Sequence, residues 1–575
     1  MNENLKTLIK NSFDKYKNNN FYIDKNKKNQ IKTYIHHGKT KIIKQNFDFI
    51  YKTYNDVYND VINLSKNLEN YIINNYQNKI QTIGILSENS YNVFLLILSS
   101  IFSKNYIIFP IYNKLIDKEN LIKSLNQINL LYIENDNRDI MNLYSKVNKN
   151  NDYNIEIIYN ISFDSSNKYC FSDLLKPNFF INENKNVFFE ENLKEFLYKY
   201  LSPTNYNIYD ISELLITNTL NDISFFECFY FNEHDIYYNI NSLNDITELI
   251  FILNIIINGG QIFINKNFSD LFEEIEYLHP TILNTYSCIW KKIYNNLNKI
   301  INSLKETEKK EIFKILKIKY SDFNNENKES DCWDKLIFDK IKYKFGGKIK
   351  YIFITNDILN PFIQKFFKIC LKAKIIKIYG ITELCGFISI NEENINENYY
   401  NIGKNLNSRK LIYKKLDKNI CFPFNLKKFD NYHEKLISLL EIEYNNYIYE
   451  TNDLIINNDN EIYFLGKKNN MLKIENKIIN SLYLENNLFF DGINNFYLFV
   501  YKNNIFLICH LNYNNINIEN IELENEKLRN EIKNNIENKY KFLNNIKIYF
   551  IQDKKYYDSK YKLNRKILYN EIIKN

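Results

Sequence analysis

The sequence YGITE at residues 379–383 combines a tyrosine ring, a hydroxyl and a carboxylate. It follows the apolar run KIIKIY at 374–379, which predicts a buried strand, and Gly380 predicts the turn that ends it. In open α/β sheets, ligands collect at the carboxyl ends of the strands, so Thr382 and Glu383 stand where chemistry is expected. Taken alone, the five residues also fit a strand-end turn with an exposed glutamate.

Two further segments follow in a fixed order. TND at 451–453 precedes GKKNNMLK at 466–473, and SKYKLNR stands at 559–565. Together with YGITE they resemble the motifs of adenylate-forming enzymes, which read Y-G-x-T-E, T-G-D, G-R-x-D-x-x-x-K and a late S-G-K-x-x-R. Each segment alone is a weak signal, whereas the ordered set is a strong one.

Residues 331–386 narrow the resemblance. They contain W-D-K-L-I-F, a Gly-Gly pair, a predicted strand and YGITE, in the order typical of long-chain acyl-CoA synthetases. The counterparts of that pattern are Trp333, Asp334, Lys335, Phe338, Lys340, Gly346 and Gly347. Residues 53–61, 108–115 and 279–294 are also similar, so the resemblance covers nearly all of the chain outside its Asn- and Lys-rich inserts.

The resemblance implies a two-step reaction. A fatty carboxylate attacks the α-phosphorus of ATP, and the thiol of CoA then attacks the acyl carbon of the acyl-AMP. By this resemblance Thr382 would donate to the α-phosphate and Glu383 would hold Mg²⁺. Tyr379 and Gly380 would lie along the adenine, and Asp453 would accept from the ribose hydroxyls.

The basic residues of the later motifs receive roles in the same way. Lys467 stands where the family has a ribose-contacting arginine, so the charge is kept and the bidentate fork is lost. Lys562 matches the catalytic lysine that bridges the carboxylate and the α-phosphate, and Arg565 matches the trailing arginine. A solvated, lysine-rich face is the alternative interpretation of Lys562. Asn469 falls at the hinge about which the family swings its C-terminal domain.

The family pattern breaks at the phosphate loop. The family reads T-S-G-T-T-G-x-P-K, a glycine-rich turn whose amides and lysine hold the β- and γ-phosphates. The matching stretch is LLITNTLNDISFF at 214–226, in which Thr219 and Asp222 replace both glycines and Phe225 replaces the lysine. Asn452 replaces the glycine of T-G-D. A degenerate loop makes ATP binding the open question of this sequence.

Helices and strands alternate around these motifs. Apolar periodicity predicts helices at 52–74, 90–103, 118–127, 247–258, 269–278 and 361–372, and strands at 82–86, 106–111, 130–133, 261–264, 281–284, 348–355 and 374–379. A later series predicts strands at 497–501, 505–511 and 546–551 and a helix at 523–540. The fold class is therefore α/β.

The resemblance implies the adenylate-forming fold, a large N-terminal domain at 1–467 made of sheets covered by helices and a small mobile α+β lid at 468–575. We interpret the low-complexity stretch near 135–200 as a partly structured surface excursion from the first domain, and the charged stretch near 300–330 as one that loops out.

Composition excludes several classes of protein. The chain has 575 residues, 45% hydrophobic and 25% charged, which rules out collagen-like, coiled-coil and wholly disordered chains. A net charge of +7 spread over this length disfavours nucleic acid as a partner. The eight cysteines form no zinc-spaced pair and are interpreted as reduced thiols. No signal peptide and no membrane-spanning run is predicted.

The leading hypothesis is an ATP-dependent long-chain fatty acid–CoA ligase of lipid metabolism, with ATP, Mg²⁺, CoA and a long-chain fatty acid as cofactors and substrates. We expect it in the cytoplasm, with peripheral contact at the cytosolic face of the endoplasmic reticulum or another membrane. The alternative is a catalytically impaired pseudoenzyme of the same fold that binds acyl ligands or a protein partner. Activation of an aryl, amino or short-chain acid is disfavoured by the W-D-K-L-I-F and Gly-Gly features.

Overall fold

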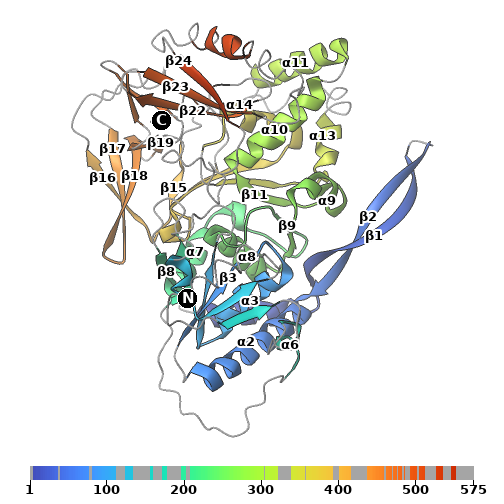
Figure 1. Ribbon diagram of the computed structural model, residues 1–575. Coiled ribbons are helices and arrows are strands. Elements are labelled where there is room, and N and C mark those ends of the chain that lie inside the picture. Colours follow the sequence, from blue (N-terminus) through green and yellow to red (C-terminus); the bar gives the residue numbers. More distant parts are fainter. Residues whose placement is uncertain are drawn as a thin grey trace. The chain divides into compact units, whose positions relative to one another are not determined.

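The computed structural model of the chain is shown in Figure 1. It describes residues 4–36, 39–76, 80–111, 123–133, 156–159, 171–177, 196–201, 208–302, 305–321, 338–355, 358–392, 401–415, 437–458, 461–468, 471–474, 477–481, 485, 488, 493–501, 504–511, 526, 528–534, 536 and 546–551. Tertiary contacts divide the chain into two units. Unit 1 comprises Met1–Asn284, Ile341–Ile352 and Gly380–Phe387, and unit 2 comprises Thr285–Lys340, Phe353–Tyr379 and Ile388–Asn575. The division after Lys467 stays a prediction.

A six-stranded sheet lies in the N-terminal part of unit 1. Its strands follow the order β6-β5-β3-β4-β7-β8, with β8 antiparallel to β7 and the other neighbours parallel. Their bounds are β3 (Gln81–Ile85), β4 (Tyr106–Pro110), β5 (Leu130–Ile133), β6 (Glu156–Tyr159), β7 (Phe196–Leu201) and β8 (Ile208–Ser212). Strands β3, β4 and β5 are buried along their whole length, as expected of parallel strands covered on both faces.

Unit 1 also holds several helices. They are α1 (Leu5–Lys15), α2 (Tyr54–Tyr76), α3 (Tyr91–Phe102), α6 (Phe171–Leu174), α7 (Glu213–Ile223), α8 (Ile246–Asn258), α9 (Leu271–Leu278) and α13 (Asp339–Lys344), the last of which begins in unit 2, with the short 3₁₀ turns η1 (Glu227–Phe229) and η2 (Phe268–Asp270). Helix α8 is mostly apolar and buried, and it begins where the Asp245 carboxylate accepts from the amide of Thr247. It ends at Gly259, whose φ is +80°.

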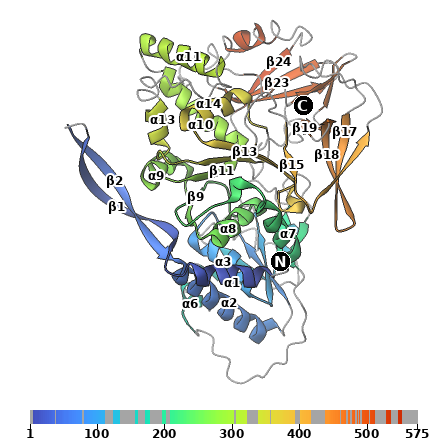
Figure 2. The same cartoon turned by 180° about the vertical axis from the view of Figure 1, so that it is seen from behind.

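A second group of strands in unit 1 includes a long two-stranded ribbon. Strands β9 (Ile236–Asn239) and β10 (Gln261–Ile264) run parallel, and β1 (Asn20–His36) joins β10 in parallel only at Tyr22 and Ile23. Strand β1 then continues as an antiparallel pair with β2 (Lys39–Thr53). In Figures 1 and 2 this pair extends beyond the rest of unit 1 as an isolated ribbon.

Unit 2 holds several smaller sheets. Its helices are α10 (Ser287–Asn302), α11 (Glu306–Ser321) and α14 (Pro361–Leu371), and β11 (Ile282–Tyr286) and β12 (Tyr351–Thr355) are divided between the two units. The strands wholly in unit 2 are β13 (Lys374–Tyr379), β14 (Ser389–Asn391), β15 (Lys404–Asn405), β16 (Lys410–Lys415), β17 (Ile437–Tyr444), β18 (Tyr447–Asn458), β19 (Glu461–Lys467), β20 (Met471–Ile474), β21 (Lys477–Asn480), β22 (Ile493–Tyr501), β23 (Asn504–Leu511) and β24 (Ile546–Ile551). Strands β16 to β19 form one antiparallel sheet in chain order.

Strands β22, β23 and β24 form a sheet with its own apolar core. Strand β23 pairs antiparallel with β22 and parallel with β24. Leu498, Leu507, Ile532 and Ile548 are among the buried residues of this core. The predicted strands at 505–511 and 546–551 are therefore confirmed.

Both inserts contain regular structure. Residues 306–321, expected to loop out, form helix α11, because Ile312, Ile315 and Leu316 share one helical face and are buried. The stretch 135–200 contributes β6 and most of β7 to the six-stranded sheet. Among the described helices, none is long and apolar enough to cross a membrane.

Candidate active site

Two glycines that admit no side chain fix the turn after β13. A Cβ atom on Gly380 would lie 2.0 Å from the carbonyl oxygen of Gly386, and one on Gly386 would lie 2.4 Å from Thr247 Oγ1. Gly386 also has a φ of +76°, which glycine adopts without strain. The amide of Gly386 donates to the carbonyl of Ile381 at 2.8 Å and closes the turn. The turn therefore has little freedom to change shape.

The turn presents the predicted hydroxyl and carboxylate side by side. Thr382 and Glu383 lie in the single 3₁₀ turn η4 (Thr382–Leu384), and both side chains are half-buried. Thr382 Oγ1 donates to Glu383 Oε2 at 3.1 Å. Leu384 and Cys385, the next two residues, are fully buried and anchor the turn. A carboxylate and a hydroxyl are oxygen ligands of the kind that Mg²⁺ binds, so the residues fit the implied ion.

Within unit 2, Tyr379 and Asp453 are joined directly. The Tyr379 hydroxyl at the end of β13 donates to Asp453 Oδ2 in β18 at 2.5 Å. Burial, together with the negative charge of Asp453, raises the pKa of Tyr379 well above its usual value. Tyr379 therefore remains a hydrogen-bond donor at physiological pH. The predicted adenine and ribose residues are in contact, although they are 74 positions apart in the sequence.

The TND segment keeps the backbone shape that glycine would supply. Asn452 has a φ of +57°, in the left-handed region that asparagine tolerates better than most residues. Thr451 Oγ1 accepts from the amide of Asp453 at 3.0 Å and donates to Leu440 O at 2.6 Å. Asp453 pairs in register with Lys467 on β19, so these two predicted ribose residues are cross-strand neighbours.

The structure therefore brings the predicted residues together in two groups. Tyr379, Asp453 and Lys467 meet in unit 2, and Gly380 with the Thr382–Glu383 pair forms one turn in unit 1. The two groups are consecutive along the chain at Tyr379 and Gly380. The predicted residues Lys562 and Arg565 and the hinge residue Asn469 lie outside the described residues.

The stretch aligned with the phosphate loop is a helix. Residues 213–223 form α7, capped by Ser212, whose side chain accepts from the amide of Leu215. Thr219 is buried and its hydroxyl donates to Leu215 O within the same helix, while Phe225 is 71% exposed after the helix ends. Amides in a helix interior bond to carbonyls four residues back, so those of α7 beyond its first turn cannot also hold a phosphate.

Sequence reasoning missed a buried carboxylate near the start of α8. Glu248 is fully buried and accepts side-chain amide hydrogens from Asn239 at 2.5 Å, Asn241 at 2.6 Å and Asn284 at 2.7 Å, and also the hydroxyl of Tyr237. Burial raises the pKa of Glu248 to about 7, although the hydrogen bonds from Tyr237 and Asn241 oppose the shift. A glutamate in an otherwise apolar helical run was the available signal.

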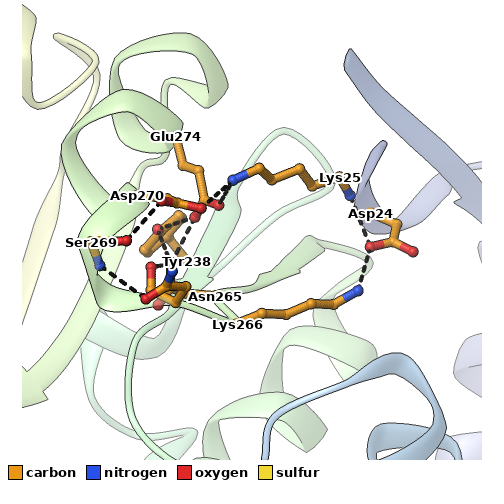
Figure 3. Close-up of polar contacts among 9 residues, drawn as sticks. Asp24, Lys25, Tyr238, Asn265, Lys266, Ser269, Asp270 and Glu274 are labelled. Atoms are coloured by element: carbon orange, nitrogen blue, oxygen red, sulfur yellow. Dashed lines mark hydrogen bonds and ion pairs between the residues drawn. The ribbon is translucent and has the colours of Figure 1, made fainter. Parts of the chain in front are cut away.

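A second buried carboxylate fixes the root of the ribbon, as Figure 3 shows. Glu274 of α9 accepts from Lys25 Nζ at 2.8 Å, from the hydroxyl of Tyr238 at 2.6 Å and from the amide of Asn265 at 2.7 Å. Lys25 also donates to Asp270 at 2.6 Å. Burial lowers the pKa of Lys25, but its bonds to these carboxylates outweigh that effect and raise it. The cluster joins β1 to α9 through hydrogen bonds and ion pairs among its own side chains.

Comparison with known proteins relates part of the chain to one family. Residues 212–417 match the model of the AMP-binding enzyme family, and this stretch contains the Gly380 turn. The chain is 30% identical over 127 residues to the peroxisomal long chain acyl-CoA synthetase 7 of Arabidopsis thaliana, which is 22% of this chain and 18% of that protein. It is 31% identical over 134 residues to fatty acyl-CoA synthetase A of Dictyostelium discoideum, 23% of this chain and 20% of that protein. The aligned stretches thus span about a fifth of these relatives.

Solved structures show the fold. The anthranilate CoA ligase AuaEII in complex with anthranoyl-AMP has a TM-score of 0.66 at 13% identity, covering 99% of this chain and 97% of that one. The A-PCP didomain of the carboxylic acid reductase from Segniliparus rugosus has a TM-score of 0.69 at 10% identity, covering 99% and 81%. The predicted α/β adenylate-forming fold is confirmed. Residues 212–417 are similar to the AMP-binding enzyme family, and long-chain acyl-CoA synthetases are among the proteins that parts of the chain resemble.

Proposed function

We propose that the protein is an ATP-dependent ligase that joins a long-chain fatty acid to CoA through an acyl-adenylate. The observation that carries this proposal is the Thr382–Glu383 pair, which the rigid Gly380 turn holds at the end of β13 within the family-matched residues. A hydroxyl donor beside a carboxylate suits a site that binds a phosphate together with its metal ion.

In the first step, a fatty carboxylate oxygen attacks the α-phosphorus, and the bond from that phosphorus to pyrophosphate breaks. Thr382 would donate to an α-phosphate oxygen on which negative charge builds up. Glu383 would hold Mg²⁺, which supplies charge neutralisation to the phosphate oxygens when bound. Lys562 would bring its positive charge between the carboxylate and the α-phosphate, and Arg565 would support the tail motif.

The nucleoside would be held by Tyr379, Gly380, Asp453 and Lys467. Tyr379 and Gly380 would lie along the adenine, and Asp453 would accept from the ribose hydroxyls while its Oδ2 also accepts from Tyr379. Lys467, the cross-strand neighbour of Asp453, would add a positive charge beside the nucleotide. In the second step the CoA thiolate attacks the acyl carbon and AMP leaves with the electron pair of the broken carbon–oxygen bond.

The long-chain substrate class rests on the named relatives. Long chain acyl-CoA synthetase 7 carries that class in its name, and fatty acyl-CoA synthetase A carries the broader class of fatty acids. The structural neighbours include a ligase of anthranilate, and their low identity supports the fold alone. We place the ligase in the cytoplasm, where a fatty acid can reach it from the cytosolic face of a membrane such as the endoplasmic reticulum.

Helix α7 favours a second candidate. Because residues 213–223 are helical where the family has a glycine-rich loop, the β- and γ-phosphates lack the amides that usually hold them. A protein of this kind would keep the fold and bind acyl ligands or a protein partner without turnover. The two candidate functions predict different results for ATP: the ligase must bind it, and the non-catalytic protein need not.

The test is acyl-CoA formation by the purified full chain with ATP, Mg²⁺ and CoA, followed by mass spectrometry of the products. Palmitate and oleate should give their CoA thioesters, whereas anthranilate, benzoate and phenylalanine should give none. Preference for an aryl or amino acid would overturn the substrate class. A folded chain that neither binds ATP in calorimetry nor forms any thioester would favour the non-catalytic candidate.

A further inference from the structure

The Gly380 turn rests on the first turn of helix α8, and both belong to unit 1. A Cβ atom on Gly386 would lie 2.4 Å from Thr247 Oγ1, so the two segments touch with no space for a methyl group. The ring of Phe387, the next residue, packs against that of Phe251 in α8 at a centroid distance of 5.9 Å. A displacement of the start of α8 would therefore move the turn and its two polar side chains.

Glu248 holds the start of α8 in place. It directly follows the residue that the turn contacts, and it is fully buried. Its Oε2 accepts from the hydroxyl of Tyr237 and the amide of Asn239, both in β9. Its Oε1 accepts from Asn241, in the loop after β9, and from Asn284 of β11. One carboxylate thus joins α8 to two strands that pair with each other.

Only the ionised carboxylate can accept from all four donors. The donors are neutral, one phenol and three side-chain amides, and a protonated carboxyl group turns one of its acceptor positions into a donor. One of the four partners must then turn away. Asn284 can do so, because its Oδ1 is buried and no described residue donates to it. Rotation of this amide by about 180° would present that oxygen to the new hydroxyl of Glu248.

We propose that Glu248 is a positioning residue for adenylation, whose ionised carboxylate holds the start of α8 where the Gly380 turn requires it. Protonation removes one donor from the carboxylate and buries the rotated Asn284 amide hydrogens in a new place, so the start of α8 shifts and the turn follows it. The link to adenylation rests on the proposed function, whereas the link between Glu248 and the turn does not.

Glu248 titrates near neutral pH. Burial raises its pKa to about 7, and the negative charge of Asp245 at the cap of α8 adds to the shift. From β9 it faces the hydroxyl of Tyr237, whose own pKa is raised well above its usual value by burial and by the charge of Glu248, so that this group keeps its proton. The partners from β9, its following loop and β11 are otherwise asparagine amides, which do not titrate.

The first experiment follows the turn in the full chain without ligands. Cys385–Gly386 is the only Cys-Gly pair in the sequence, so ¹⁵N-glycine combined with carbonyl-¹³C cysteine gives a single NMR cross-peak, that of the Gly386 amide. This signal should move with pH through a midpoint at about 7, and it should keep one position in Glu248→Gln. Gly466 of β19, the only glycine that follows a leucine, is the reference signal and should show no such midpoint.

Two conservative variants keep the test decisive where Glu248→Gln fails to fold. Asp245→Asn retains a side chain that caps helices and removes a negative charge, so the midpoint should fall, by about 0.5 to 1 pH unit. Tyr237→Phe removes one donor to the ionised carboxylate, so the midpoint should rise by about as much. A structural role without titration predicts neither shift.

Fatty-acid-dependent release of pyrophosphate from ATP then relates the titration to adenylation. At pH 6 about a tenth of the chains would carry the ionised carboxylate, so the wild type should be slower there than at pH 8 by about tenfold. Glu308→Gln, which changes an exposed glutamate, should keep this profile. Glu248→Gln should be slow at both pH values and lack the rise.

The two proposals fail in different ways. A Gly386 signal that does not titrate, titrates equally in Glu248→Gln, or keeps its midpoint in both conservative variants would overturn the inference whatever the ligase activity. A rise in rate that persists in Glu248→Gln would overturn the role in adenylation. A wild type that releases no pyrophosphate while its Gly386 signal titrates would overturn the proposed function and support the coupling of Glu248 to the turn.

Discussion

The Tyr379 hydroxyl donates to Asp453 Oδ2 at 2.5 Å, and this bond joins the end of β13 to the TND segment of β18. The two residues come from motifs that the sequence places far apart, and the nucleoside of the proposed substrate would contact both. The hydrogen bond fixes the position of one carboxylate oxygen, so Asp453 is oriented before any ligand arrives. This fixed orientation is what the proposed role of Asp453 as a ribose acceptor requires.

Removing the Tyr379 hydroxyl should weaken ATP binding. In Tyr379→Phe the carboxylate of Asp453 loses a donor and its fixed orientation, so the Kd for ATP should rise by about tenfold. Isothermal calorimetry measures the change. Tyr447→Phe is the control, because Tyr447 lies on β18, the strand of Asp453, and its side chain is 71% exposed. An unchanged ATP affinity in Tyr379→Phe would refute the role of this pair.

A methyl group at Gly380 should disable the turn. Its Cβ would lie 2.0 Å from the backbone oxygen of Gly386, which no side-chain rotation can relieve, so the turn must shift. Displacement of Thr382 and Glu383 by about 1 Å should lower acyl-adenylate formation by about 100-fold. Gly347→Ala is the control, since the nearest atom to the Cβ of residue 347 would be 3.6 Å away, and its φ of +74° accounts for a cost in stability alone. That control should lose stability, by about 1 kcal/mol, and keep its activity.

Glu248 should make stability depend on pH. Its pKa is raised from 4.5 to about 7 in the folded state, so the folded protein binds the proton more tightly than the unfolded chain. The resulting stabilisation is full below about pH 4.5 and is lost as the pH rises toward 7, by an amount on the order of 3 kcal/mol. Urea unfolding at a series of pH values measures it. Glu248→Gln cannot titrate and should lack that part of the slope. An identical slope in the variant would contradict the assignment.

Much of the fold could be predicted where apolar runs are bounded by clear breaks. Strands β10 and β13 have the predicted limits, because each apolar run ends at a glycine, a lysine or an asparagine. Helix α11 was missed because its charged residues outnumber the few apolar ones that face inward. Strands β6 and β7 were missed because they are short and lie among Asn- and Lys-rich stretches with no periodicity.

The candidate site was predictable as a set of motifs but not as a geometry. The YGITE motif identifies Thr382 and Glu383, and only the structure shows that a Gly386 backbone oxygen closes over Gly380. Contact between Tyr379 and Asp453 depends on how distant strands are placed, which local patterns do not contain. Glu248 could not be found from its partners, because asparagine is too common in this chain to mark a polar cluster.

The most direct test of the account is fatty-acid-dependent release of pyrophosphate from ATP, measured for the wild type and for Glu383→Gln. Glu308→Gln is the control, because Glu308 is an exposed glutamate of α11. We predict that the wild type and Glu308→Gln release pyrophosphate with palmitate, and that Glu383→Gln is slower by at least about 100-fold, since the site loses its carboxylate for the metal ion. Equal rates in Glu383→Gln and the wild type would contradict the assignment of this turn as the adenylation site.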